Sequence, residues 1–188
     1  MAQGIPGQTH EAAKQYRLVR IVPRAAMAAV QSQRGEVDNA LENFAITLKI
    51  QVHDLQDNEF HYSTRGIWYA QLLTHLGELA EALCVNVRNR EVCQEKGWLD
   101  KVALCDLLFA ELARLQGKFG EARKSAAQAL AWGNRTADQE VLVWGNLVRA
   151  RIALDTNSLI ETERAVREGL RIAEYCGYGL VYSTEAVA

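Results

Sequence analysis

A short basic segment with two glycines has the residue types of a phosphate-binding loop. Residues 117–125 read GKFGEARKS, and glycine backbone N–H groups together with a lysine could cradle a phosphate. The spacing differs from Gly-x-x-x-x-Gly-Lys-Ser/Thr, and the segment follows a predicted helix, whereas a phosphate loop follows a strand. We therefore interpret it as a turn and a helix start, and we expect no nucleotide cofactor.

The cysteines and histidines have no metal-ligand spacing. Cys84 and Cys93 are nine residues apart, and Cys93 and Cys105 are twelve apart, so neither pair forms a zinc knuckle. No local signature supports a cysteine–histidine nucleophile, although such a pair formed in three dimensions stays open. We expect four reduced, buried thiols, Cys176 included, in a cytoplasmic protein. With no convergent acid–base set, we expect no metal site, no catalytic residue and no enzyme activity.

Composition and charge exclude several classes of protein. The 188 residues are 49% hydrophobic and 23% charged, which is typical of a folded domain. The net charge of −2 comes from basic and acidic residues mixed along the chain, so no basic stripe predicts nucleic-acid binding. No apolar stretch approaches the roughly 20 residues that span a bilayer. We expect neither nucleic acid nor membrane as a partner.

Small residues recur at a fixed period and indicate an internal repeat. Ala28, Ala70, Ala110 and Ala150 lie 42, 40 and 40 residues apart. Seven residues later stand Gly35, Gly77, Gly117 and Asn157, and five residues further stand Ala40, Ala82, Ala122 and Thr162. Two antiparallel helices approach closely only where side chains are small, so the columns predict stacked helical hairpins.

Each repeat is predicted as two helices around a tight turn. The predicted helix pairs are 24–34 with 36–54, 58–76 with 78–96, 99–116 with 118–132, and 136–155 with a helix ending at 176. Gly133–Arg135 is interpreted as a helix break, and Thr136 with Gln139 as a capping box. Residues 1–23 are expected to form a flexible leader with a possible short helix at 11–20, ended by Pro23. The repeats are placed at about 24–57, 58–97, 98–135 and 136–177, with a partial fifth at 178–188.

These columns resemble the tetratricopeptide repeat family. The family's hairpin has a small residue in its first helix, a glycine near that helix's end and an alanine early in the second, as in Ala110, Gly117 and Ala122. The fourth copy departs at Asn157 and Thr162. The period of 40 to 42 residues exceeds the family's 34 and is similar to the long repeats of bacterial signal-transduction ATPases and maltose-regulator-like transcription activators. The resemblance implies an all-α, right-handed superhelical solenoid of about four and a half repeats.

The resemblance also places a concave, partner-binding surface on the first helix of each pair. Positions counted from the small-residue column give Ala29, Ser32, Gln33, Gln71, Thr74, His75, Glu111, Arg114, Leu115, Arg151, Leu154 and Asp155. Arg114 and Arg151 could bind a peptide carboxylate through forked hydrogen bonds, or they could pair with Glu111 and Asp155. The lysine–asparagine clamp with which some members bind a chaperone C-terminus is absent.

Aromatic rings offer a further candidate for ligand contact. Trp68 and Trp144 lie on predicted first helices and could stack on a ligand in the groove. Trp98, Trp132 and Tyr182 are expected to fill gaps between helices, and packing is the simpler role for every ring.

We expect a noncatalytic protein–protein interaction scaffold that holds a peptide or helical segment in the groove. The alternative is a ligand-sensing module of a larger signalling ATPase or transcription regulator. The residues predicted to line the partner-binding groove are Gln71, Thr74, His75, Glu111, Arg114, Trp144, Arg151 and Asp155. Leu180, Val181 and Tyr182 do not form a polar cap, so we expect either a longer natural chain or a homodimer through the C-terminal end.

Overall fold

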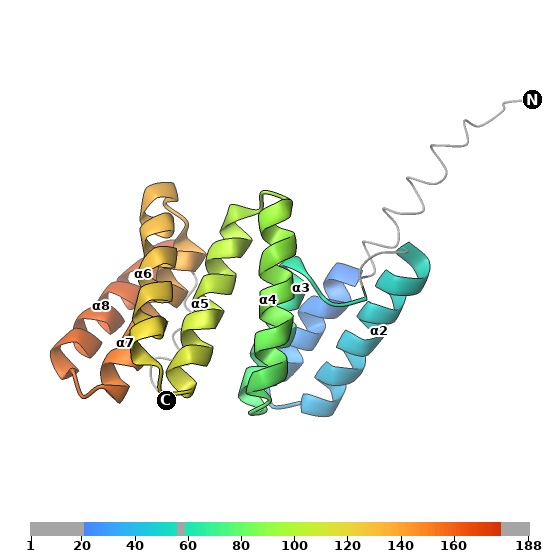
Figure 1. The fold of residues 1–188 in the computed structure, drawn as a ribbon, viewed down its shortest axis with the longest axis horizontal. Coiled ribbons are helices and arrows are strands. Elements are labelled where there is room, and N and C mark those ends of the chain that lie inside the picture. Colours follow the sequence, from blue (N-terminus) through green and yellow to red (C-terminus); the bar gives the residue numbers. More distant parts are fainter. Residues whose placement is uncertain (1–20, 56–58, 178–188) are drawn as a thin grey trace, which may run out of the picture. The chain divides into compact units, whose positions relative to one another are not determined.

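The computed structural model describes residues 21–55 and 59–177, and every regular element in these ranges is a helix (Figure 1). The chain divides into two compact units, Met1–Val85 and Asn86–Ala188, so the boundary lies within helix α4 (Leu79–Glu95). None of the helices described combines the length and the apolar character that a membrane-spanning helix needs. The expectation of an all-helical fold is confirmed for these residues.

The first unit begins with helical residues 21–33 and continues with α2 (Val37–Leu55) and α3 (Ser63–His75). Pro23, predicted to separate a leader from the first hairpin, lies inside the first helical stretch, whose backbone angle proline can adopt. The predicted helix at 11–20 lies outside the described residues. The predicted start of α3 at residue 58 is wrong: Phe60 is not helical, and its carbonyl accepts a 2.9 Å hydrogen bond from Gln51 Nε2.

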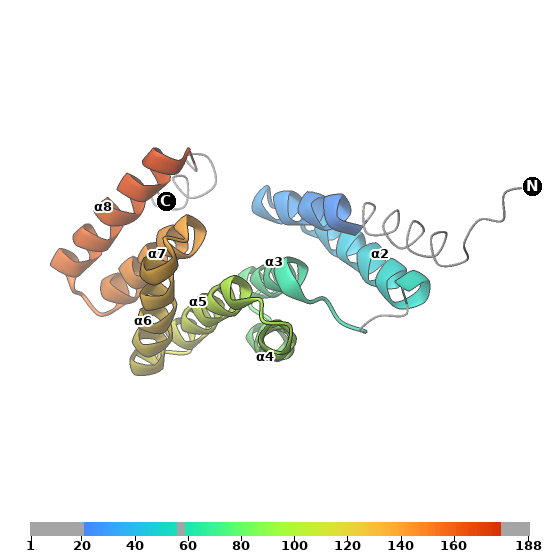
Figure 2. The same ribbon diagram turned by 90° about the horizontal axis from the view of Figure 1, so that it is seen from above.

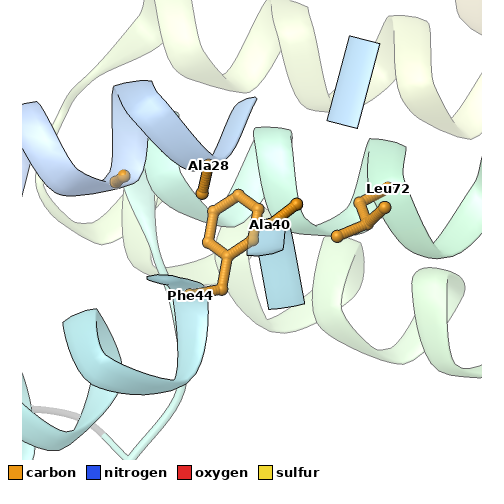
Figure 3. Close-up of a cluster of buried hydrophobic side chains, with 5 residues drawn as sticks. Ala28, Ala40, Phe44 and Leu72 are labelled. Atoms are coloured by element: carbon orange, nitrogen blue, oxygen red, sulfur yellow. The ribbon is translucent and has the colours of Figure 1, made fainter. Parts of the chain in front are cut away.

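The core of the first unit joins the small-residue columns to a few large side chains. The alanines of the cluster, Ala25, Ala28 and Ala40, are fully buried, and Phe44 and Leu72 are its large members (Figure 3). Trp68 packs against this cluster and is half-buried, so its main role is packing.

Up to residue 177, where the description ends, the second unit holds the rest of α4 and four complete helices, α5 (Leu99–Leu115), α6 (Phe119–Thr136), α7 (Gln139–Asp155) and α8 (Leu159–Cys176). Helix α5 packs on α6 and α7, α6 packs on α7, and α7 packs on α8 (Figures 1 and 2). The column residues Ala110 and Ala122 are fully buried, and Ala150 is 4% exposed. Small residues therefore lie where the helices of this unit meet, as the columns predict.

Two predictions at the junction of α6 and α7 are wrong. Gly133 does not end α6, which continues to Thr136. A Cβ on Gly133 would lie 3.0 Å from Val141 Cγ1, so this glycine lets α7 approach α6. The cap of α7 is Asp138, whose carboxylate accepts a 3.0 Å hydrogen bond from the backbone N–H of Val141, while Thr136 belongs to α6.

The left-handed turn residues follow the repeat period. Gly117 has φ +73° and Asn157 has φ +56°, which confirms that asparagine replaces glycine in this column. Left-handed residues also follow the second helices at Gly97, Ala137 and Gly177, which are 40 residues apart. Both kinds of helix end are thus set by single residues that recur with the period.

We expect the substitution Gly145→Ala to destabilise the second unit by about 1–3 kcal/mol. A Cβ on Gly145 would lie 2.6 Å from Leu130 Cδ2 and 3.4 Å from Leu107 Cδ2, so either the Leu130 side chain would have to leave its position or α6 and α7 would have to move apart. Gly120→Ala is the control, because nothing lies within 4 Å of its Cβ position in α6. Urea denaturation should show Gly120→Ala to be neutral or stabilising by up to about 1 kcal/mol. Equal effects of the two substitutions would contradict this account.

Candidate functional site

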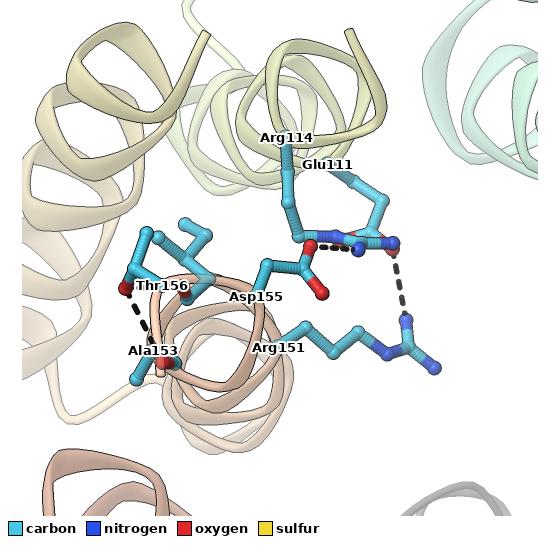
Figure 4. A network of polar contacts seen from close by, with 7 residues as sticks. Glu111, Arg114, Arg151, Ala153, Asp155 and Thr156 are labelled. Atoms are coloured by element: carbon cyan, nitrogen blue, oxygen red, sulfur yellow. Dashed lines mark hydrogen bonds and ion pairs between the residues drawn. The ribbon is translucent and has the colours of Figure 1, made fainter. Parts of the chain in front are cut away.

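Four charged side chains on α5 and α7 form one hydrogen-bonded network. Arg114 donates from Nε and Nη2 to the two carboxylate oxygens of Glu111, at 3.2 and 2.9 Å. Its Nη1 donates to Asp155 Oδ2 at 2.6 Å. Arg151 Nη1 donates to Glu111 Oε1 at 3.2 Å, as Figure 4 shows. Glu111 therefore binds two arginines, one from each helix.

The network is neutral and partly removed from water. The side chains of Glu111 and Arg114 are only 10% and 15% exposed, whereas those of Arg151 and Asp155 are 31% and 35% exposed. Burial acts to lower the pKa of Arg114, but its bonds to Glu111 and Asp155 outweigh this effect and raise that pKa above its usual value. Of the two roles that the sequence leaves open for these arginines, pairing with the neighbouring acids is the one observed.

The same pairs fix the register of α5 beside α7. The partners are 40 and 41 residues apart, which is one repeat period. Next to them, Arg123 Nη2 at the start of α6 donates to Thr156 Oγ1 after α7, at 2.8 Å. The α5–α6 turn and the α7–α8 turn consequently lie side by side, and we call this region the turn end of the second unit.

Large aliphatic side chains are exposed at the turn end. Leu115 and Leu154, chain neighbours of the paired Arg114 and Asp155, are 43% and 54% exposed. Leu159 and Ile160, which begin α8, are 70% and 86% exposed. The predicted binding surface includes the two leucines Leu115 and Leu154 but not Leu159 and Ile160. The sequence did contain a signal for this exposed pair, because two large apolar residues directly follow the polar turn at 156–158.

The remaining predicted site residues lie elsewhere. Gln71, Thr74 and His75 are on α3 in the first unit: Gln71 is half-buried, His75 is exposed, and the buried Thr74 hydroxyl donates to the Ala70 carbonyl at 2.7 Å. Trp144 is only 6% exposed and belongs to the core of the second unit. Its ring therefore does not line a surface groove, because α7 turns this position inward.

Two open cavities lie between α6 and α8, with α7 as their floor. Their volumes are about 380 and 460 Å³, and both are lined by Leu130, Asn134 and Arg149. Arg149 Nε lies 3.5 Å from Glu161 Oε1. These cavities were not predicted, because the groove positions were counted on the first helices alone.

The cysteine, histidine, aspartate and glutamate side chains form no metal centre in the part of the chain that the structure describes. No three His, Cys, Asp or Glu side chains there could hold a metal ion. Cys93 and Cys105 are buried beside Asn89, and the hydrogen bond between the two thiols together with burial raises the pKa of Cys105. The prediction that all four thiols are buried is wrong for Cys84, which is exposed, and for Cys176, which is only half-buried.

A buried histidine lies in the core of the first unit. His61 is 3% exposed and contacts the rings of Phe44 and Tyr69, with centroids 5.4 and 5.0 Å away. Burial, and then the positive charge of Arg65, lower the pKa of His61 to about 4. The sequence did not distinguish this histidine from the others.

Searches against protein-family models, curated proteins and solved structures each found no match for this chain.

We expect Glu111→Ala to destabilise the second unit by about 2–4 kcal/mol, because it removes the carboxylate that binds both Arg114 and Arg151 in a partly buried position. Glu163→Ala removes a carboxylate that pairs with Arg167 on α8 but is 64% exposed, so we expect less than about 0.5 kcal/mol. Urea denaturation of both variants measures the difference. If both variants lost less than about 0.5 kcal/mol of unfolding free energy, the network would contribute no more than an exposed surface ion pair does.

The stability of the first unit should depend on pH through His61. Because its folded pKa of about 4 lies below the usual 6.5, the unfolded chain binds the proton more readily. The stabilisation is complete above about pH 6.5 and is lost as the pH falls towards 4, by about 2 kcal/mol at pH 5. His61→Phe keeps a ring and removes the proton site, so its unfolding free energy should change less between pH 7 and pH 5. Parallel pH profiles for the two proteins would exclude His61 as the titrating group.

Proposed function

We propose that this chain is a noncatalytic protein-interaction scaffold built as a right-handed, tetratricopeptide-like solenoid. Buried alanines and left-handed turn residues at a 40-residue spacing support the repeat architecture. A scaffold of this kind acts through its surface alone, so the groups that matter are those that a partner can reach.

The contact surface that we propose is the turn end of the second unit. The observation that carries it is the group of exposed aliphatic side chains around a neutral ion network: Leu115, Leu154, Leu159 and Ile160. Exposed apolar groups gathered beside fixed polar groups are typical of protein-binding surfaces.

The pairing of the arginines defines the chemistry of the partner. A peptide carboxylate would have to displace Glu111 or Asp155, which already bind Arg114 at 2.9 and 2.6 Å. The proposed partner is therefore a peptide or helix that presents apolar side chains to the leucines and isoleucine, with polar groups contacting the more exposed Arg151 and Asp155.

A second candidate is the ligand-sensing module of a larger regulator. The two cavities around Arg149, at about 380 and 460 Å³, fall in the size range of small-molecule sites and favour this function. Both cavities are open to solvent, whereas small-molecule sites enclose most of the ligand surface, so the interaction scaffold remains our first choice.

Selection of random peptides on the immobilised full chain tests the proposed surface. The variant Leu154→Asp/Ile160→Asp places two charges in it, and the selected peptides should bind this variant at least about tenfold more weakly. Leu99→Asp is the matched control, because Leu99 is 55% exposed, as Leu154 is at 54%, but begins α5 at its other end.

Peptides that bind both variants as tightly as the unmodified chain would place the binding surface elsewhere. Failure to select any peptide would favour the ligand-sensing alternative. Helix content measured by circular dichroism should stay unchanged in both variants, since all three leucine and isoleucine side chains are exposed.

A further inference from the structure

The cavity of about 380 Å³ between α6 and α8 contains an arginine whose hydrogen-bond donors are unused. The side chain of Arg149 is 34% exposed, and its Nε lies 3.5 Å from Glu161 Oε1, which is beyond the usual length of a hydrogen bond. None of the five N–H groups of this guanidinium donates a hydrogen bond within residues 21–55 and 59–177. Arg149 can therefore bind an anion without giving up a hydrogen bond that it already makes.

The charges that line this cavity leave an excess of one positive charge. Its charged residues are Arg149, Arg171 and Glu168, which are two cations and one anion. Arg171 donates to both carboxylate oxygens of Glu168, at 3.0 and 2.7 Å, so these two groups neutralise each other. Glu161 lines the neighbouring cavity of about 460 Å³ but not this one. Charge complementarity therefore favours a ligand with a single negative charge.

A buried carboxamide lies one helical turn before Arg149. Asn146 is 4% exposed, and its Nδ2 donates to the Leu142 carbonyl at 2.9 Å. Its second N–H and its Oδ1 form no hydrogen bond among the described residues, although the side chain lines the cavity. Burying an amide with unused polar groups is unfavourable unless another molecule completes its hydrogen bonds. Because residues three apart share one face of a helix, a carboxylate bound to Arg149 lies within reach of this N–H.

The remaining surface of the cavity suits an apolar, flat body. Leu130, Leu142 and Ile172 come from α6, α7 and α8 and all line it. Tyr175 lines it as well and is 87% exposed, so its ring is available to pack against an aromatic ligand. A few polar groups beside an apolar wall are typical of small-molecule sites.

We propose that this cavity binds a small aromatic monocarboxylate. Its carboxylate accepts hydrogen bonds from Arg149 and Asn146, and its ring packs against the apolar wall and Tyr175. The inference rests on the second candidate function, the ligand-sensing module, and names the ligand class of that module. The contact surface at the turn end is separate from it, because neither Leu154 nor Ile160 lines this cavity.

Titration of the full chain with hydrocinnamate and its neutral amide, hydrocinnamamide, tests the ligand class. The two probes share a phenyl ring and a short linker and differ in charge. Ligand-observed NMR should give a Kd of about 1 mM or below for the acid. The amide should bind at least about tenfold more weakly, because it cannot accept a charge-assisted hydrogen bond.

Variants of the lining residues separate the carboxylate contact from the ring contact. Arg149→Gln should weaken binding of the acid at least about tenfold and change binding of the amide by less than about twofold. Arg167→Gln is the matched control on α8, since this arginine is 77% exposed and does not line the cavity. Tyr175→Ala should weaken both probes to the same extent, because the ring contacts the body that they share.

Glu161→Gln tests the same contact if Arg149→Gln lowers the helix content. Removing the acid beside Arg149 should strengthen binding of hydrocinnamate by about two- to threefold and leave the amide unchanged. Glu161 is 43% exposed, so this variant should fold as the unmodified chain does.

Three results would overturn the proposal. The first is equal affinity for the acid and the amide, which would keep a ligand-binding module but reject its preference for anions. The second is acid binding that neither Arg149→Gln nor Glu161→Gln alters, which would place the carboxylate elsewhere. The third is no binding of either probe up to roughly 10 mM by a folded chain, which would also count against the ligand-sensing module. Peptide binding at the turn end would be unaffected by all three results.

Discussion

The close approach of helices at small side chains is the constraint on which the second unit depends. Gly145 leaves no room for a methyl group against Leu130, and Gly133 leaves little against Val141. Helices separated by larger residues would no longer bring Glu111 within hydrogen-bond distance of Arg151. The ion network is thus a consequence of the packing. The glycines set how closely the helices approach, and the ion pairs fix how α5 and α7 are aligned along their lengths.

This dependence accounts for which features could be predicted from the sequence. The alanine and glycine columns predicted the hairpins and the left-handed turns, because helices that repeat the same close contact need a small residue at the same place in every copy. Gly133 was misread as a helix break, since glycine serves both as a terminator and as a site of close packing, and only the position of α7 separates the two uses. The cap of α7 was misplaced by two residues for a similar reason: Thr136 and Asp138 both suit the role.

The candidate site could be predicted only in part. Spacing brought Glu111, Arg114, Arg151 and Asp155 together, but whether the arginines bind these acids or a partner depends on distances that a sequence does not contain. Trp144 was predicted to line the groove because it lies on a first helix, and that helix was assigned correctly. The side of the helix on which the ring lies was assigned wrongly, since the structure buries the ring. Leu159 and Ile160 escaped attention since the groove positions were counted on the first helices alone.

The neutrality of the ion network has a consequence for how a partner would arrive. Two positive and two negative charges of the network cancel over a few ångströms, so the network itself projects little field beyond the roughly 8 Å over which charges act at physiological ionic strength. These four side chains would therefore contribute little to steering a partner from a distance. The binding free energy of such a complex would come mainly from removing the aliphatic side chains from water. The change in heat capacity on binding would therefore be negative.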